Sequence, residues 1–368
     1  MANWTTEKRR VAVGRVSLAA ASSAALVAAA FGVSTGRAAE ANDGAGAAAI
    51  AEESTETKRS AAAVELFGDL NFEHGFQIVD GSETLGVLRL PLTGEKAESV
   101  GAPTWKLAQH WSKFDLSRPE TRTTTENEAR AATPGLAVAR TKTADGTVAL
   151  RLEVAAEAEY DAPRRAGQNW LHLLLQRDFA PSERVAFADV ESLVFTCDAQ
   201  VLRSEWSASD GEFDPNLHAT QASVYFAISN DDPDSPDYRD YIWFGVSFFD
   251  SRWEIQSRYV AVDGDPRTIG TGKLIYRLGE QKTIDDILGG VNPFSMKPVR
   301  IEIDLARYLG DALQAAKERN FLTETRVEQM KLAHFNFGWE TPGTYRAALE
   351  IKGPRLVATP KKTIGDAK

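Results

Sequence analysis

The sequence predicts an all-β domain in which two antiparallel sheets pack as a sandwich, with one helix in the C-terminal half. Three observations predict it. From residue 64 onward, aromatic and β-branched residues occur in short runs separated by clusters of Gly, Pro, Asn and Asp, as is typical of strands joined by turns. Strands do not alternate with helices, which disfavours a parallel sheet. Only one segment has a long helical repeat of apolar residues.

Residues 1–41 have the pattern of a cleavable export signal. A positively charged start that includes Arg9 and Arg10 precedes the uncharged segment 16–33, and Ala-Glu-Ala at 39–41 is a suitable cleavage site. The many Ala and Gly residues favour a signal peptide over a membrane anchor. The residues around the arginine pair favour the general secretory route over the twin-arginine route. We therefore expect a secreted or periplasmic protein with no membrane anchor in its mature form.

Composition sets further limits on the rest of the chain. Residues 42–63 contain few large apolar groups and are expected to be a disordered spacer, which leaves 64–368 as a single domain. The net charge of the whole chain is −10, which disfavours nucleic acid as a partner. Cys197 is the only cysteine, so no intramolecular disulfide can form and the stability must come from burial of a core.

The expected strands follow from runs of apolar and aromatic residues. In chain order they span residues 72–79, 85–90, 136–141, 148–155, 170–176, 192–202, 222–229, 241–249, 253–260, 273–278, 299–305, 331–338 and 345–357. The third and fourth strands flank Asp145-Gly146 and should form a hairpin. The predicted helix starts at Leu305, with Asp304 as its cap. Residues 94–134 receive no assignment.

Two segments resemble parts of known carbohydrate-active proteins. Asn-Phe-Glu-His-Gly-Phe at 71–76 is similar to the first strand of glycan-binding modules, glucanases and polysaccharide lyases of the concanavalin-like and galactose-binding-like type. Residues 335–345 and 351–356 are similar to their last two strands. The resemblance implies an antiparallel two-sheet jelly-roll β-sandwich that acts on or binds sugars. The acidic strand motif of laminarinase-type glucanases and the strand motifs of alginate lyases are absent.

The alternation of side chains along strands selects candidate binding residues. In 170–176, the three leucines at odd positions should face the core, which leaves Trp170, His172 and Gln176 on the other face. Aromatic rings beside amide and imidazole groups are suited to sugars, because rings stack on C–H faces while polar groups bond to hydroxyls. The alternative is a histidine with satisfied hydrogen bonds on an ordinary solvent face.

A second set of candidates lies on two later strands. Tyr241, Trp243, Ser247 and Phe249 should share one face of their strand, and Tyr225 should lie on the matching face of its own strand. If the strands are neighbours, Tyr225, Tyr241 and Trp243 line a groove with His172. The alternative is that residues 94–134 cover this face.

Catalysis is a further option for the same residues. Polysaccharide lyases need a Tyr or His that abstracts a proton and an Arg or Gln that neutralises a uronate, and His172, Gln176, Arg252 and Tyr259 supply these types. The alternative for Arg252 is a salt bridge in a hairpin. Hydrolysis would need two carboxylates, and no pair stands out among the five candidates. These are Asp198, Glu205, Asp250, Glu254 and Glu340.

No cofactor is required by these interpretations, and one metal site is a candidate. Four aspartates in the loop 230–237 are oxygen ligands of the kind that calcium prefers, although acidic loops are often only solvated. The candidate calcium ligands are Asp231, Asp232, Asp234 and Asp237. We therefore expect a secreted protein that binds a polysaccharide or oligosaccharide. The alternatives are a lyase or glycoside hydrolase that uses the same groove, and a structural or adhesive surface protein.

Overall fold

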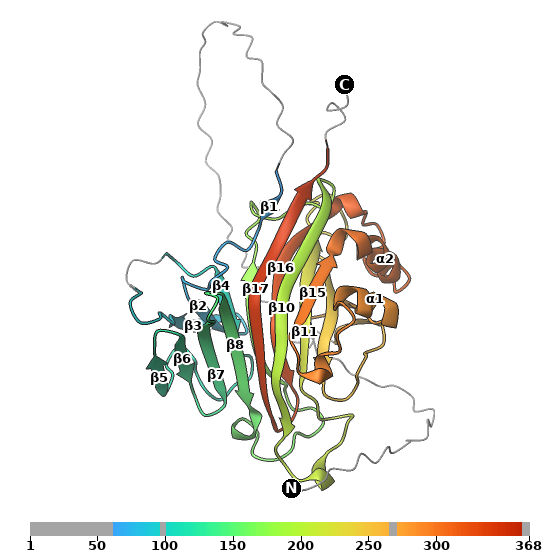
Figure 1. Cartoon of the computed structure of the whole chain (residues 1–368). Helices are drawn as coiled ribbons and strands as arrows, with labels where there is room; N and C mark the ends of the chain where they lie inside the picture. The colour runs from blue at the N-terminus through green and yellow to red at the C-terminus, as the bar shows by residue number, and fades with distance from the viewer. Residues whose placement is uncertain (1–61, 96–100, 265–270, 363–368) are drawn as a thin grey trace, which may run out of the picture.

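The computed structural model describes residues 62–95, 101–264 and 271–362. The predicted export signal and nearly all of the predicted spacer lie outside these residues. The described chain forms two large sheets packed face to face, with two helices on one flank (Figure 1). This confirms the predicted jelly-roll β-sandwich. No helix in the described part of the chain is long and apolar enough to cross a membrane.

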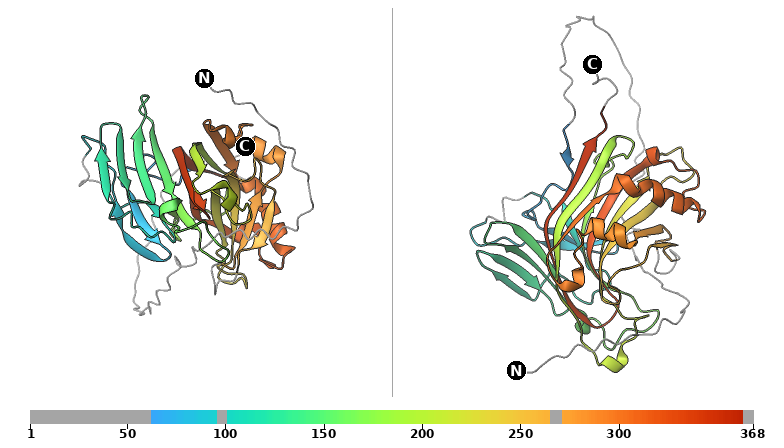
Figure 2. Two further views of the ribbon diagram at one scale, coloured as in Figure 1. Left: turned by 90° about the horizontal axis from the view of Figure 1, so that it is seen from below. Right: turned by 45° about the vertical axis from the view of Figure 1, so that its right-hand side comes forward.

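The first sheet contains eight strands in the order β15-β10-β17-β8-β7-β6-β5, with β1 paired to β17. Its longest strands, β10 and β17, run side by side through the centre of the molecule (Figures 1 and 2). The strands are β1 (Val64–Glu65), β5 (Thr121–Thr124), β6 (Glu128–Ala132), β7 (Leu136–Lys142), β8 (Val148–Ala155), β10 (Val190–Trp206), β15 (Val299–Asp304) and β17 (Tyr345–Pro360). The hairpin expected around Asp145-Gly146 is the β7–β8 pair.

The second sheet contains nine strands in the order β13-β14-β12-β11-β16-β9-β4-β2-β3. They are β2 (Phe76–Asp80), β3 (Glu83–Leu88), β4 (Trp105–Ala108), β9 (Leu171–Asp178), β11 (Gln221–Asn230), β12 (Tyr241–Asp250), β13 (Tyr259–Val262), β14 (Leu274–Leu278) and β16 (Met330–Thr341). Two neighbouring pairs, β2–β4 and β12–β14, are parallel. The prediction of wholly antiparallel sheets was wrong at these two places.

The predicted helix is α2 (Leu305–Lys317), and the Asp304 side chain caps it by accepting a hydrogen bond from Ala306 N. Its apolar side packs against β10, β12 and β14. A second, shorter helix, α1 (Gln281–Ile287), was not predicted. It has only two buried apolar side chains, too few to give a clear helical repeat in the sequence.

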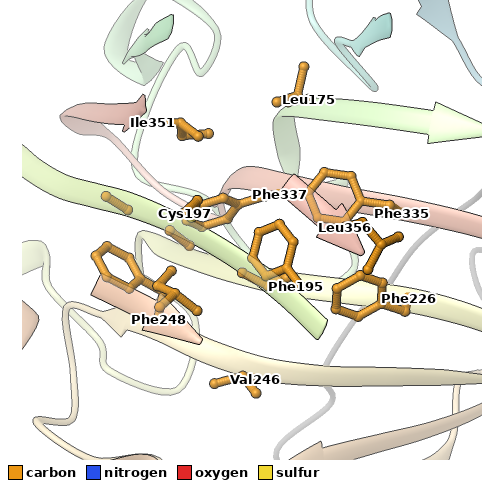
Figure 3. Packing of buried hydrophobic residues seen from close by; sticks show 14 of the residues in the cluster. Leu175, Phe195, Cys197, Phe226, Val246, Phe248, Phe335, Phe337, Ile351 and Leu356 are labelled. Atoms are coloured by element: carbon orange, nitrogen blue, oxygen red, sulfur yellow. The ribbon is translucent and has the colours of Figure 1, made fainter. Parts of the chain in front are cut away.

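The core lies between the sheets and consists of the inward-facing side chains of both. Phe195 of β10 contacts Phe226 of β11 and Phe335 of β16, with ring centroids 5.6 and 5.2 Å apart (Figure 3). Trp339 is fully buried and donates its Nε1–H across the sandwich to Leu152 O at 3.1 Å. Cys197 is also fully buried in this core.

Three segments differ from the prediction. The strand expected from residue 72 begins only at Phe76, because Phe72 and Gly75 have positive φ angles of 56° and 76° and form a turn. The strand expected at 253–260 is mostly a turn, and β13 begins at Tyr259. Residues 94–134 contribute β4, β5 and β6 to the sheets. The described residues of this segment are therefore part of the sandwich, although His110 and Trp111 also cover His172 on the outer face of the second sheet, in part as the alternative expected.

Candidate functional site

The nine-stranded sheet has a second face, directed away from the core, that is rich in polar and aromatic side chains. We call it the polar face. It arises because apolar residues alternate with polar ones along β9, β11, β12 and β16. The residues that the argument uses are Lys106, His172, Gln176, Asp178, Gln221, Tyr225, Tyr241, Trp243, Ser247, Asp250, Tyr259, Arg277, His334, Asn336 and Glu340.

Strand register arranges these side chains in rows across the sheet. One row crosses six strands and consists of Gln176, Asn336, Tyr225, Gly245, Arg277 and Tyr259. A second row consists of His172, Glu340, Gln221 and Asp250. At a strand spacing of about 4.8 Å, the first row is roughly 24 Å long. It is therefore longer than a single sugar ring.

The predicted aromatic residues lie together in the middle of this face. Trp243 contacts Tyr241 and Tyr225, with centroids 5.3 and 6.5 Å apart and nearly perpendicular rings. The Tyr225 ring lies over Gly245, where a Cβ would come within 2.2 Å of it. Burial raises the pKa of Tyr225 to about 12, although the positive charge of Arg277 acts in the opposite direction. The predicted grouping of Tyr225, Tyr241 and Trp243 is what the strand pairing produces.

Many buried polar atoms on and beside this face have no hydrogen-bond partner among the described residues. They are His110 Nε2, His172 Nδ1 and Nε2, Gln176 Nε2, Trp243 Nε1, Ser247 Oγ, Gln256 Oε1, Arg277 Nε and His334 Nε2. Native proteins rarely leave buried donors and acceptors unpaired, because each costs about 1–3 kcal/mol. These atoms are therefore available to bond to water or to a bound molecule that reaches them.

Glu340 is the carboxyl group of the face whose pKa is raised most. It lies opposite His172 on β9 and accepts a hydrogen bond from Gln221 Nε2 at 2.7 Å. Burial raises its pKa to about 7, and the negative charges of Asp263 and Asp250 act in the same direction. Burial also raises the pKa of Asp263 to about 6, although Thr271 donates two hydrogen bonds to it. Glu340 can therefore carry a proton near neutral pH.

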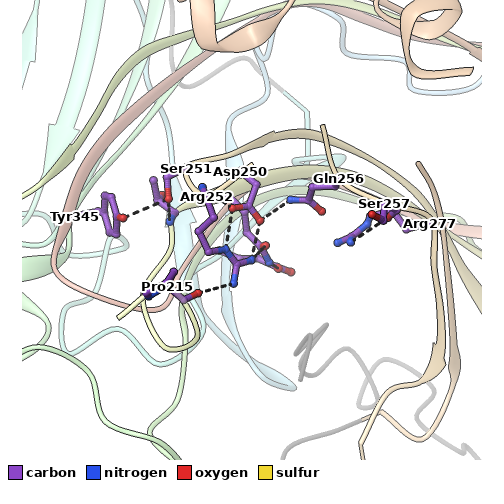
Figure 4. A network of polar contacts seen from close by, with 11 residues as sticks. Pro215, Asp250, Ser251, Arg252, Gln256, Ser257, Arg277 and Tyr345 are labelled. Atoms are coloured by element: carbon purple, nitrogen blue, oxygen red, sulfur yellow. Dashed lines mark hydrogen bonds and ion pairs between the residues drawn. The ribbon is translucent and has the colours of Figure 1, made fainter. Parts of the chain in front are cut away.

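Asp250, at the end of β12, organises the neighbouring turn (Figure 4). Its carboxylate accepts hydrogen bonds from Arg252 Nε at 2.9 Å, from Arg252 Nη2 at 2.7 Å and from Gln256 Nε2 at 2.5 Å. Arg252 Nη2 also lies 3.4 Å from Gln221 Oε1, which links this ion pair to Glu340. Of the five carboxylates considered for hydrolysis, only Asp250 and Glu340 lie on the polar face. Asp198 and Glu205 are exposed on the first sheet, and Glu254 is exposed in a turn.

A third polar group lies at the opposite end of β16. Asp178 accepts a hydrogen bond from Lys106 Nζ at 2.5 Å and contacts His334 Nδ1 at 2.5 Å. Burial opposes ionisation of Asp178, but its bonds to His334 and Lys106 hold its pKa well below the usual range. The Trp243 ring lies 5.6 Å from the His334 ring. The sequence pattern did not single out any of Lys106, Asp178 and His334.

The predicted site residues are less accessible than expected, since none of them on or beside β9, β11 and β12 is more than 8% exposed: Trp170, His172, Gln176, Tyr225, Tyr241 and Trp243. His172 does lie on the polar face, but His110 and Trp111 cover it, with ring centroids 5.7 and 5.3 Å away. Burial, and then the proximity of His110, lower the pKa of His172 well below its usual value. Trp170 precedes β9 and is buried beneath Arg164, whose guanidinium carbon lies 5.7 Å from the ring centre. It does not join the central aromatic group.

The four residues considered for lyase chemistry are not brought together. His172 and Gln176 lie four residues apart on β9, about 14 Å along the strand. Arg252 is engaged by Asp250, as the salt-bridge alternative expected. Tyr259 lies at the edge strand β13, five strands away from β9, with the guanidinium carbon of Arg277 5.4 Å from its ring centre.

Phe249 also departs from prediction: an irregular β11–β12 register turns it into the core beside Trp339.

The acidic loop makes protein contacts with three of its four aspartates. Asp231 pairs with Arg184 at 2.7 Å, Asp232 accepts from Gln329 Nε2 at 2.6 Å, and Asp237 accepts from Thr325 Oγ1 at 2.9 Å. Asp234 donates its backbone N–H to Asp232. In the described ranges, no group of three or more His, Cys, Asp or Glu side chains is placed to hold a metal ion. The calcium site stays a prediction.

No protein-family model matches the chain, and no curated protein matches it. Among solved structures it is similar to a family 11 xylanase from Neocallimastix patriciarum, with 9% identity and a TM-score of 0.33 over 64% of this chain and 96% of that chain. It is similar to a family 12 xyloglucanase from Bacillus licheniformis, with 8% identity and a TM-score of 0.36 over 66% and 98% of the two chains. It is also similar to an endoglucanase from Rhodothermus marinus, with 11% identity and a TM-score of 0.35 over 64% and 93%. At this level of similarity, the matches say nothing about activity.

Proposed function

We propose that the polar face binds a polysaccharide or oligosaccharide chain laid across the strands. The observation that carries the proposal is the group of unpartnered buried donors and acceptors around Tyr225, Tyr241 and Trp243. A sugar presents hydroxyls that both donate and accept, together with C–H faces that stack on rings. One kind of ligand can therefore form hydrogen bonds with the donors of Trp243 and Gln176 and with the oxygen of Ser247.

The proposal predicts that some substitutions have opposite effects on stability and on binding. In Trp243→Phe, a smaller aromatic ring replaces the indole and the Nε1 donor is lost. Stability should change little, because removal of a buried donor that is poorly paired in the protein offsets part of the cost of the smaller ring, whereas glycan affinity should fall about tenfold through the loss of one hydrogen bond. Gln176→Leu should behave in the same way. A residue that serves only the fold would lower stability when replaced and leave affinity intact.

The test is affinity gel electrophoresis of the purified chain against neutral and uronic-acid polysaccharides, with denaturant unfolding of each variant. Calcium and a chelator form parallel arms, so that the predicted calcium site is tested in the same experiment. Tyr238→Ala is the matched control, since Tyr238 is an exposed aromatic residue outside the polar face. The proposal is supported if at least one polymer retards the wild type in the gel and retards Trp243→Phe less strongly. No retardation across the panel contradicts it and favours a structural or adhesive role.

A second candidate is cleavage of the bound glycan, favoured by the pair formed by Glu340 and Asp250. General acid catalysis needs a carboxyl group that holds its proton near neutral pH, and Glu340 has a pKa of about 7. Asp250 lies two strands away, with Gln221 between them, so their Cα atoms are about 10 Å apart. Carboxyl groups about as far apart as these Cα atoms predict inversion at the anomeric carbon.

Reducing-end release separates this candidate from binding alone. Glu340→Gln and Asp250→Asn should each abolish release while the glycan remains bound, and Glu205→Gln on the first sheet should not affect it. If the wild type releases no ends from any polymer that it retards in the gel, the chain binds without hydrolysing.

A further inference from the structure

A cavity of about 300 Å³ adjoins the Asp250 end of the polar face. It lies between the end of β12, the turn 251–256, helix α1 and the segment 290–293. Phe248, Leu278 and Ile284 supply part of its apolar wall, and Ser247 and Gln256 supply polar groups. We call it the Trp253 pocket, after the indole at its rim. A cavity of this size matches the lower end of the range for small-ligand sites.

Two polar atoms of the lining have no partner in the part of the chain that the structure describes. Ser247 Oγ and Gln256 Oε1 belong to side chains that are each only 8% exposed. Gln256 is held in place because its Nε2 donates to Asp250 Oδ2 at 2.5 Å, which leaves the amide oxygen for another donor (Figure 4). The pocket therefore borders two hydrogen-bonding positions that the described residues do not use, and because both atoms have less than 1 Å² of accessible surface, a ligand reaches them when the lining side chains shift.

Trp253 presents an apolar surface at the rim. Its side chain is 59% exposed, and it is the only exposed tryptophan among the described residues. The turn that carries it is anchored: Trp253 N donates to Asp250 O at 3.1 Å, and Arg252 N donates to Asp250 Oδ1 at 2.9 Å. An exposed indole on an anchored turn is suited to stack on the C–H face of a sugar.

The charge of the lining restricts the ligand. Glu254 and Asp285 contribute carboxylates, the Asp250 carboxylate is already paired with Arg252, and the lining contains no Lys or Arg of its own. A uronate or sulfated sugar would meet like charges without a cation to neutralise it. A neutral ring meets no such obstacle.

We propose that the Trp253 pocket is a subsite for one neutral sugar ring, located at the end of the chain bound on the polar face. The ring stacks on Trp253, and its hydroxyls bond to Ser247 Oγ and Gln256 Oε1. The inference rests on the proposed glycan-binding function, because Ser247 and Asp250 belong to both surfaces. Asp250 also places the subsite beside the Glu340–Asp250 pair.

The test measures the affinity of the purified chain for a length series of oligosaccharides taken from the polymer that it binds best, with tryptophan fluorescence as a second readout. Trp253→Ala should weaken binding about tenfold for long oligosaccharides, and should leave unchanged the shortest ones that fit on the polar face alone. Ser247→Ala removes only a hydroxyl that has no partner among the described residues, so it should reproduce part of the loss without disturbing the fold. Tyr238→Ala is again the control.

The outcomes distinguish the subsite from the function on which it rests. If Trp253→Ala binds every length as the wild type does while Trp243→Phe binds more weakly, the pocket is not a subsite and the polar face still binds glycan. If a uronic-acid unit is preferred at the position that Trp253→Ala affects, the assignment of a neutral ring is overturned. If no oligosaccharide binds at all, the proposed function and the subsite both fail.

Discussion

At the scale of single residues, a buried carboxyl group couples the stability of the domain to pH. Glu340 is buried, and its pKa of about 7 lies above the ordinary value of 4.5. The folded state therefore holds the proton more tightly than the unfolded chain does. The resulting contribution to stability is fully present below pH 4.5 and is lost as the pH rises to about 7.

Glu340→Gln should remove this dependence. Because one pKa unit is worth about 1.4 kcal/mol, the variant should gain roughly 3 kcal/mol relative to the wild type between pH 4 and pH 8. Urea unfolding across this range measures the difference, and Glu205→Gln should stay parallel to the wild type. If the free energy of unfolding of Glu340→Gln also changed with pH in parallel with that of the wild type, the pKa of Glu340 would not be raised in the folded protein.

Gly245 should be intolerant of any side chain. A Cβ at this position would lie 2.2 Å from a Tyr225 ring atom and 2.8 Å from Val224 O. Gly245→Ala should therefore destabilise the domain by about 1–3 kcal/mol and weaken glycan binding, because the ring must move. Gly310→Ala is the matched control: it lies in α2 with nothing within 4 Å, and it should stabilise by about 1 kcal/mol. Equal effects of the two substitutions on unfolding would contradict this account.

Alternation in the sequence was sufficient to find Tyr225, Tyr241, Trp243 and Gln176, because each lies inside a strand with an unbroken apolar face. It missed the strand position of Glu340, because the strand was expected to end at residue 338. In the structure β16 continues to Thr341, and the Asn336, Gly338, Glu340 series has the same period of two. The pairing of Asp178 with His334 joins residues 156 positions apart and has no local signal.

At the scale of elements, the positions of the strand ends determine which side chains lie on the polar face. The irregular register between β11 and β12 directs Phe249 inward and leaves Asp250 on the polar face. Nothing in the local sequence marks this shift, since Phe248 and Phe249 are both suited to the core. The strand expected at 253–260 fails for a related reason: Asp250 accepts hydrogen bonds from the backbone and side chain of Arg252, which closes a turn.

Helix α2 offers a test at this scale. The Asp304 side chain accepts hydrogen bonds from Ala306 N at 3.1 Å and from Leu193 N at 3.0 Å, so it caps the helix and also joins it to β10. Asp304→Ala should cost about 2 kcal/mol, more than most helix caps, because a strand donor also loses its partner. Asp311→Ala, on the exposed side of α2, is the control for thermal unfolding. A cost no larger than that of Asp311→Ala would contradict the dual role.

At the scale of the whole molecule, the single thiol reports on opening of the sandwich. Cys197 is fully buried between the sheets, and burial raises the pKa of its thiol. Labelling by a thiol reagent should therefore require global unfolding, and its rate should rise with urea in step with the unfolding equilibrium. Rapid labelling of the native protein would show that β10 or β15 separates locally.

The sandwich architecture was predictable from the pattern of apolar, polar and turn-forming residues in the sequence, whereas the strand order was not. Short strands with one apolar face specify two packed sheets, and that is what the structure contains. The two parallel pairs and the insertion of β16 between β9 and β11 depend on contacts between distant segments. Local patterns carry no information about such partners.

The positions of the last two strands affect how the chain reaches its folded state. β16 lies between β9 and β11 in one sheet, and β17 lies between β8 and β10 in the other. Neither sheet is continuous until residues 330–360 have joined it, so strands synthesised earlier keep exposed edges until then. Folding should be slow, as is usual when distant pairings dominate. A growing chain would stay open to binding by chaperones or to transport in an extended form until residues 330–360 have been made.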